Sequence, residues 1–171
     1  MNLIIYTDNE KYRMHCEEYK IIWEKEGKKI QDAYEKVLHI PFKEKEIKLL
    51  INSGKDGSNY SGDTINDEMN FRYNNRCKIG TFLHELSHRI IMEYDLFSKG
   101  KKLYNYKDIH EVVDLFLYDV ICNLYGEESA NMRVEYESGF EEETYRTSWE
   151  EALSKTYEER QEIIKRIMEV E

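Results

Sequence analysis

The sequence predicts a fold that combines α-helices with a small β-sheet. Short apolar runs alternate with polar residues at a period of two, as in half-buried strands. Longer stretches repeat apolar residues every three or four positions, as in amphipathic helices. With 171 residues, of which 40% are hydrophobic, the chain is long enough for one core and short for two. We therefore expect a single domain over residues 1–171.

The N-terminal part predicts a strand followed by a long helix. Residues 3–6 form a short apolar run, and Thr7 and Glu10 have the spacing of a capping box, which marks a helix start. Apolar residues then keep a helical period as far as Pro41, and Gly27 is a candidate break midway.

Two further strands are expected, with a loop between them. Residues 47–51 and 65–74 alternate apolar and polar side chains, whereas residues 53–64 are rich in Gly, Ser and Asp. The loop lacks the Lys-Ser or Lys-Thr of a nucleotide-binding loop, and the chain has no G-x-S-x-G motif. These absences argue against a P-loop nucleotidase and a serine hydrolase.

Residues 84–88 read HELSH, an H-E-x-x-H motif, within a predicted helix over residues 80–94. The apolar residues of this helix form one stripe, and His84 and His88 lie together on another sector. Two neutral imidazoles one turn apart can bind one Zn²⁺, with Glu85 beside the position of the attacking water. The alternative is an accidental motif on the exposed face of a helix that binds no metal.

A catalytic zinc needs a third protein ligand, and a second predicted helix offers candidates for it. Gly100 and its lysine neighbours predict a loop, and residues 107–125 then resume a helical period. This helix carries His110, Glu111 and Asp114. Adjacent helical residues point about 100° apart, so His110 and Glu111 cannot easily face one metal together. Periodicity alone does not choose between them.

The C-terminal part predicts a charged loop and a final helix. Residues 126–147 hold seven glutamates with only Arg133 and Arg146 as bases, which is typical of a solvated loop. An acidic rim that favours basic peptides is the functional alternative. Ser148 and Glu151 have the spacing of a capping box, which predicts that one helix runs from there through Ile167.

Composition excludes several classes of protein. There are 25 basic and 35 acidic residues, and the net charge of −10 argues against a nucleic-acid partner. No apolar run approaches transmembrane length, and the first residues do not form a signal peptide, so we expect a cytoplasmic protein with no membrane partner. Cys16, Cys77 and Cys122 lack C-x-x-C spacing and predict neither disulfides nor a thiolate zinc site. We expect Cys77 to be a buried packing residue.

The motif and the glutamate that follows it resemble the gluzincin metallopeptidases, whose third ligand is a glutamate twenty or more residues further along, on a second helix. Here 22 residues lie between His88 and Glu111. The resemblance implies a zincin-like α+β fold, with a small mixed sheet, an active-site helix and a C-terminal helical part. It also favours Glu111 over His110 as the third ligand. Asp114 lies three residues after Glu111, whereas the family's histidine-orienting aspartate lies four after.

By this resemblance the chain is a zinc-dependent metallopeptidase that acts on a peptide or protein substrate. His84, His88 and Glu111 would bind Zn²⁺, and Glu85 would be the general base for the attacking water. The strand over residues 65–74 would be either the edge along which a peptide adds or an ordinary edge strand. Five tyrosines are candidate oxyanion donors: Tyr118, Tyr125, Tyr136, Tyr145 and Tyr157.

Two other classes of protein remain open on the sequence alone. The first is a non-catalytic zincin-like module that binds zinc or a partner without turnover. The second is a structural helical protein in which HELSH is accidental. Zinc content separates the second class from the others, and a missing tyrosine donor or a blocked cleft would favour the first.

Overall fold

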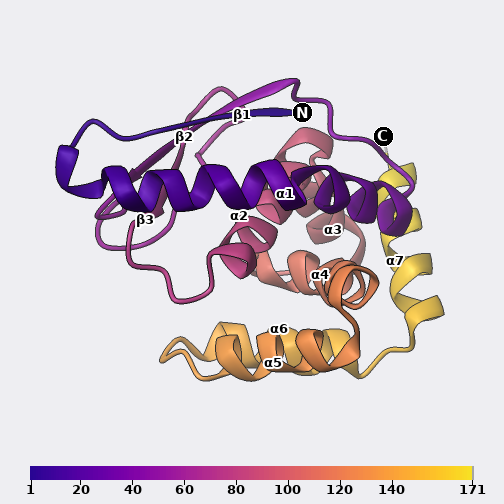
Figure 1. Ribbon diagram of the computed structural model, residues 1–171. Helices are drawn as coiled ribbons and strands as arrows, with labels where there is room; N and C mark the ends of the chain where they lie inside the picture. The colour runs from indigo at the N-terminus through magenta and orange to yellow at the C-terminus, as the bar shows by residue number, and fades with distance from the viewer. Residues whose placement is uncertain (171) are drawn as a thin grey trace.

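The computed structural model describes residues 1–170, and these form seven α-helices and one three-stranded sheet. In chain order the elements are β1 (Asn2–Tyr6), the 3₁₀ turn η1 (Glu10–Tyr12), α1 (Arg13–Leu38), β2 (Glu46–Asn52), β3 (Met69–Arg72), α2 (Lys78–Tyr94), α3 (Leu96–Tyr104), α4 (His110–Tyr125), α5 (Glu127–Ser138), α6 (Glu143–Leu153) and α7 (Tyr157–Glu169). Figure 1 shows the sheet at the top, α1 and α2 next to it, then α4, with α5 and α6 at the bottom. The α+β class is confirmed.

The sheet is parallel throughout, not mixed as expected. The strand order is β1-β2-β3, with Leu3 opposite Ile47 and Ile51 opposite Phe71. Each connection crosses over the sheet, through α1 in the first case and through a long loop in the second, which gives parallel neighbours. Alternate residues are buried in β1, β3 and the start of β2, where one face packs against helices and the other is largely open, and Leu50 is buried as well. This one-sided burial is why the strands were recognisable from alternation.

Helix α1 begins later than predicted and is not interrupted. Asn9 caps the short turn η1 by accepting a hydrogen bond from Lys11 N, so the Thr7–Glu10 capping box does not form. Gly27 lies inside the helix. A larger residue would not fit there, because a Cβ would be 2.7 Å from the Trp23 ring. The glycine accommodates a packed indole and is not a helix break.

Buried aromatic side chains fix α2 against α1 and the sheet. Tyr19, Phe71 and Phe82 are fully buried, and their ring centroids lie 5.5 to 5.8 Å apart. The buried Tyr34 hydroxyl donates to the carbonyl of Leu83 and lies 2.8 Å from Ser87 Oγ. Both bonds hold the turn of α2 that carries the H-E-x-x-H motif.

The chain after the motif is more helical than predicted. Helix α2 ends at Tyr94, where Asp95 adopts the left-handed conformation, and α3 occupies the expected loop around Gly100. Gly100 lies inside α3. A larger residue would not fit there, because a Cβ would be 2.9 Å from the Tyr106 ring. Among residues 1–170, no helix is long and apolar enough to cross a membrane.

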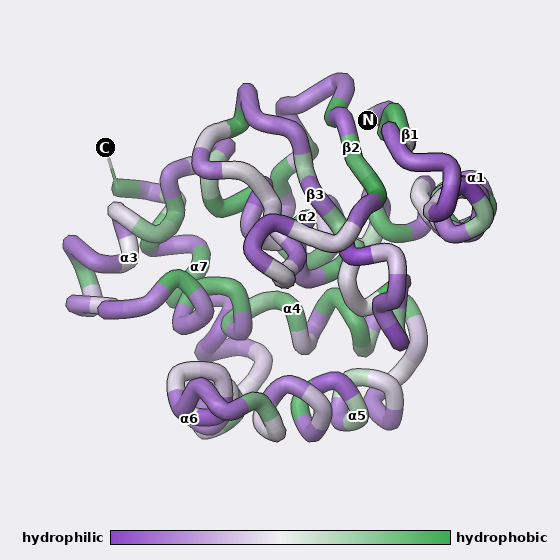
Figure 2. Tube along the Cα trace, turned by 90° about the vertical axis from the view of Figure 1, so that its left-hand side faces the viewer, coloured by the Kyte–Doolittle hydropathy of each residue, from purple (hydrophilic) through white to green (hydrophobic). Residues whose placement is uncertain are grey.

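Helix α4 lies between the layer of α1 and α2 and the layer of α5 and α6. Figure 2 shows it as mostly hydrophobic, with α2 on one side and α5 and α6 on the other. A helix that is apolar on most of its faces is one that neighbours cover.

The predicted acidic loop over residues 126–147 is mostly helical, as α5 and the start of α6. Ser148 is buried inside α6 and does not begin a helix. The capping box of the last helix is formed instead by Thr156 and Glu159. The expected single helix is therefore two helices, α6 and α7.

Candidate metal centre

Three histidines from two helices meet where α2 packs on α4; His84 is buried, and His88 and His110 are half-buried. His84 and His88 come from the motif, and His110 is the first residue of α4. One ligand nitrogen from each lies within 4.8 Å of the other two. The Nε2 atoms of His84 and His88 are 3.1 Å apart, close to the roughly 3.3 Å that two nitrogens in a tetrahedral zinc site require.

Carboxylates on the far side of two of these rings leave Nε2 free to coordinate. His110 Nδ1 lies 2.7 Å from Asp108 Oδ1, and His84 Nδ1 lies 2.8 Å from Glu137 Oε1. The second contact is an ion pair, since the ring N–H is not aligned on the oxygen. A carboxylate at Nδ1 holds the proton there and directs the Nε2 lone pair inward. His110 Nε2 is buried without a hydrogen-bond partner, as expected for an atom that binds a metal.

Glu111, which the resemblance favoured as third ligand, does not lie in this cluster. Its carboxylate accepts hydrogen bonds from the backbone N–H groups of Lys107, at 2.5 Å, and Asp108, at 2.8 Å. It therefore caps the N-terminus of α4. The rotation of about 100° between neighbouring helical residues places His110 toward the two motif histidines and Glu111 away from them.

Asp114 does not take the orienting role that the resemblance left in doubt. It is fully buried and accepts a 2.6 Å hydrogen bond from Ser148 Oγ. Burial raises the pKa of this carboxyl well above its ordinary value, and the Ser148 hydrogen bond opposes that shift. Its hydrogen-bond partner lies on α6, so Asp114 fixes α4 to α6.

Glu137 provides the charge behind His84. It is fully buried, its carboxylate also pairs with Arg133, and it accepts a 2.9 Å hydrogen bond from Trp149 Nε1. Burial alone would raise the pKa of Glu137, but His84, Arg133 and Trp149 together lower it to about 2. Gly80 makes room for this arrangement, because a Cβ there would be 2.7 Å from the Arg133 guanidinium.

The protonation of His88 and His110 suits metal binding, which requires neutral imidazoles, whereas a metal at His84 would have to displace a proton. Burial, together with the neighbouring His84 and His110, lowers the pKa of His88 well below its usual value. Burial also lowers the pKa of His110, although Asp108 opposes the shift. For His84, burial lowers the pKa, but the charge and close contact of Glu137 and the charge of Glu85 together outweigh burial, so the pKa is raised.

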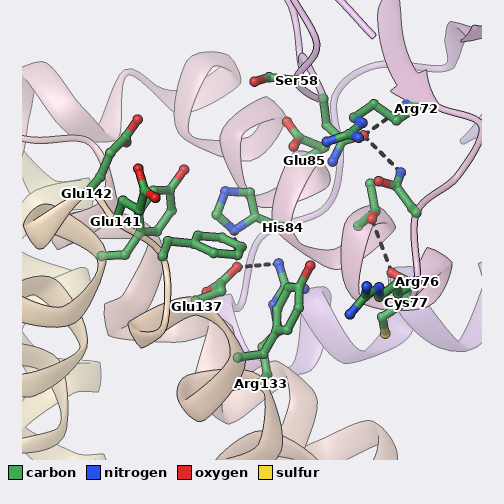
Figure 3. A pocket seen from close by; sticks show the side chains of 16 residues that line it. Ser58, Arg72, Arg76, Cys77, His84, Glu85, Arg133, Glu137, Glu141 and Glu142 are labelled. Carbon is green, nitrogen blue, oxygen red and sulfur yellow. Dashed lines mark hydrogen bonds and ion pairs between the residues drawn. The ribbon is translucent and has the colours of Figure 1, made fainter. Parts of the chain in front are cut away.

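The motif opens onto a cleft of about 380 Å³ that His84, Glu85 and Tyr145 line (Figure 3). Glu85 is only 7% exposed, and burial raises the pKa of its carboxyl, opposed by the charges of His84 and Arg133 and by a hydrogen bond with Ser61. The Tyr145 ring centroid lies 4.4 Å from that of His110. Burial and nearby carboxylates raise the pKa of Tyr145 to about 12, so its hydroxyl stays protonated and can donate.

The outer edge of β3 is closed. Asn70 exchanges two backbone hydrogen bonds with Tyr60, at 2.8 and 2.9 Å. Arg72 N donates to Asn59 Oδ1 at 3.0 Å, and Arg72 O accepts from the Tyr19 hydroxyl at 2.9 Å. A peptide could add along this edge only by displacing these groups, so the geometry favours the ordinary edge strand over a substrate-binding one.

Several residues of the site were not found by sequence reasoning. Glu137 and Arg133 were assigned to a solvated loop, yet their i,i+4 spacing is itself a helical signal. Asp108 could not be recognised from the sequence, because its contact with His110 depends on a turn and follows no helical or strand spacing. Cys77, expected to be buried, is exposed and caps α2 by accepting from Gly80 N at 3.3 Å.

No protein-family model, curated protein or solved structure matches the chain. Whatever function is assigned must therefore follow from the arrangement of the residues themselves. That arrangement is a three-histidine cluster, buried at His84 and half-buried at His88 and His110, with carboxylate partners for two of the rings and a glutamate beside it that lines a cleft.

Proposed function

We propose that the chain is a zinc-dependent hydrolase that cleaves peptide bonds, with His84, His88 and His110 as the metal ligands. The observation that carries the proposal is the convergence of three histidine nitrogens within 4.8 Å. Three protein ligands with one position left open is the pattern of a catalytic zinc site, whereas structural sites use four. The ligand set replaces the Glu111 of the gluzincin resemblance with His110, and the zincin-like fold stays a prediction.

The donor chemistry favours zinc among the common metals. Imidazole nitrogens suit zinc and the neighbouring transition metals, whereas magnesium and calcium take oxygen ligands. When bound, a Zn²⁺ ion would supply Lewis acidity and lower the pKa of a water molecule toward neutrality. The carboxylates of Asp108 and Glu137 keep the His110 and His84 rings, respectively, in one orientation.

Glu85 is the residue that moves the proton. It follows His84 directly, is buried, and lines the cleft. Its carboxylate takes a proton from the attacking water and returns it to the leaving amine, a contribution on the order of 10² to 10⁴ in rate. Amines are poor leaving groups unless they are protonated, so this transfer is what makes an amide a feasible substrate.

Tyr145 is the oxyanion donor we select from the five candidate tyrosines. It lines the same cleft as Glu85, and its ring lies beside those of His110 and His84. Because its pKa is about 12, the hydroxyl keeps its proton at neutral pH. It can therefore donate a hydrogen bond to the negative oxygen that develops on the scissile carbonyl.

The test is Glu85→Gln, which should keep zinc and lose cleavage. The amide cannot accept a proton from water, and Glu85 is not in the ligand cluster. Zinc content by elemental analysis and cleavage of a mixed peptide library measure the two properties separately. Glu24→Gln, an exposed site on α1, is the matched control and should change neither.

Two results would overturn the assignment. Loss of zinc together with activity in Glu85→Gln would make Glu85 a ligand. A wild-type protein that holds zinc but cleaves no peptide in the library would be a zinc-binding module without turnover.

A further inference from the structure

The cleft carries opposite charges at its two ends. Arg72 and Arg76 lie at one end, and Glu141 and Glu142 lie at the other, with His84 and Glu85 between them (Figure 3). All of these side chains line the same cleft. A peptide that lies along the cleft would pass from a basic region, past His84 and Glu85, to an acidic one.

The basic end has unpaired arginines in a chain with an excess of acid. Within residues 1–170, no carboxylate forms an ion pair with Arg72 or Arg76, although the chain has 35 acidic and 25 basic residues. Arg72 Nε is buried without a hydrogen-bond partner. A buried donor with no partner is costly, and a guanidinium binds a carboxylate through two parallel hydrogen bonds.

The position of Arg72 is fixed before any ligand arrives. Its backbone N–H and carbonyl are both hydrogen-bonded, to Asn59 and Tyr19 respectively. The stem packs on Gly54, where a Cβ would lie 2.7 Å from Arg72 Cγ. A side chain whose backbone and Cγ are held in this way has less conformational freedom to lose on binding.

The acidic end is a turn between α5 and α6. Glu141 and Glu142 are exposed there, and neither pairs with a base among the described residues, because the nearby Arg146 pairs with Glu143 and Glu150. The preceding Phe140 anchors the turn. Its ring packs edge-on against those of Tyr136 and Tyr145, each with a centroid distance of 5.1 Å.

We infer that the substrate is a peptide with an acidic side chain on one side of the scissile bond and a basic side chain on the other. The acidic side chain binds Arg72 and Arg76, and the basic one lies beside Glu141 and Glu142. This inference rests on the proposed hydrolase for the position of the scissile bond. The closed edge of β3 supports it, because selection then depends on side chains and not on strand pairing.

Electrostatic complementarity of this kind acts mainly on specificity. A peptide in the reverse orientation of charge would meet like charges at both ends, which costs affinity. The discrimination should weaken as salt rises, because the acidic end is exposed and the Debye length shortens from about 10 Å at 0.1 M to about 3 Å at 1 M.

The experiment uses two mirror peptides of identical composition. One carries two aspartates before and two lysines after a neutral central segment, and the other has the reverse order. Cleavage is measured with zinc-loaded wild type, and binding with zinc-loaded Glu85→Gln by fluorescence anisotropy. We expect one order to be preferred by about tenfold in both assays, given two exposed or half-buried charge contacts at each end.

A charge-reversal variant tests which residues cause the preference. Arg72→Glu and Arg76→Glu combined with Glu141→Lys and Glu142→Lys should invert it. Arg76→Gln with Glu141→Gln, both at exposed positions, is the milder variant and should reduce it if the full reversal does not fold. Zinc content and circular dichroism verify that each variant is intact.

The outcomes separate the two proposals. Equal binding and cleavage of both peptides by wild type overturns the charged-cleft inference, as does a preference that is not inverted in the folded reversal variant or not reduced in the milder one. Cleavage itself would still keep the hydrolase. Selective binding of one peptide without cleavage by wild type supports the charged cleft and removes the hydrolase.

Discussion

Glu137 is the residue whose charge most affects the candidate centre. Its buried carboxylate contacts a motif histidine and Arg133 through Oε1 and accepts a hydrogen bond from Trp149 through Oε2. Truncating one partner of a buried charge cluster leaves the others uncompensated, which is strongly destabilising. Glu137 should therefore determine both the stability of the metal-free protein and its dependence on pH.

The sign of this dependence follows from the pKa of Glu137, which is about 2 in the fold against an ordinary value of 4.5. Because the folded value is the lower one, ionised Glu137 stabilises the fold above pH 4.5, and that stability is lost as the pH falls toward 2. Glu137→Gln should lower the free energy of unfolding of the metal-free protein by about 3 kcal/mol at neutral pH.

The check is denaturant unfolding of metal-free wild type and Glu137→Gln at a series of pH values. The difference between the two proteins should shrink below pH 4.5. Glu135→Gln, exposed on the same helix, should match wild type throughout. A difference that does not vary with pH would mean that the Glu137 charge is not the cause.

At the scale of residues, the sequence predicted only those residues of the candidate site that lie on one turn of one helix. His84, Glu85 and His88 are related by helical geometry alone, so their placement on one helix needed no tertiary information. The choice between His110 and Glu111 depended on how α4 is rotated against α2. The capping bonds of Glu111 turn its side chain away from the cluster, and the packing of α4 on α2 brings His110 into it. Neither interaction can be read from the periodicity of the sequence.

At the scale of elements, Arg89 connects α2 to the long loop before β3. The side chain is fully buried, and its guanidinium donates to Glu44 at 2.8 Å. It also donates to four backbone carbonyls of the loop, at 2.6 to 3.1 Å: those of Ser61, Thr64, Ile65 and Asp67. The same loop includes Ser58 and Asn59, which line the cleft, so Arg89 holds the segment that follows one wall of it.

Arg89→Met should destabilise the protein by about 3 to 5 kcal/mol, because it leaves Glu44 and the loop carbonyls buried without partners. Denaturant unfolding measures the loss, and hydrogen exchange of residues 60–67 should accelerate. Arg13→Met is the control, since the Arg13 side chain is 70% exposed in a surface ion pair and should cost less than about 1 kcal/mol. Equal losses in the two variants would show that Arg89 does not hold the loop.

Elements with one buried face were predictable, and elements buried on several faces were not. The strands and α1 show clear periodicity because solvent contacts their other face. Helix α5 was missed since its glutamates resemble a solvated run, although Glu137 faces inward. The loop expected at Gly100 is a helix because the glycine there serves close packing and not a turn.

At the scale of the molecule, the candidate centre joins separate layers of the fold. The ligands come from α2 and α4, and their carboxylate partners come from α5 and the turn before α4. A metal bound there would hold these layers together and would not bind the unfolded chain in the same way. Metal binding should therefore stabilise the whole protein.

Zinc at about 100 times its dissociation constant should raise the free energy of unfolding by about 2.7 kcal/mol. For a chain of this length that corresponds to a rise in Tm of roughly 5 to 10 °C. Thermal unfolding with and without zinc measures the shift, and a chelator should reverse it. His84→Ala combined with His88→Ala should show no shift; a shift of the same size in that variant would place the metal elsewhere.

The central claim is that His84, His88 and His110 bind one zinc ion, and the most direct measurement is the zinc affinity of His110→Ala beside that of its neighbour Glu111→Ala. Competition with a chromophoric chelator gives both. We expect about one zinc per wild-type chain. His110→Ala should weaken binding by more than the roughly 10- to 100-fold typical of an outer-shell residue. Glu111→Ala should keep the affinity and lose only about 1 kcal/mol of stability from the α4 cap. A larger loss of affinity in Glu111→Ala than in His110→Ala would contradict the three-histidine centre.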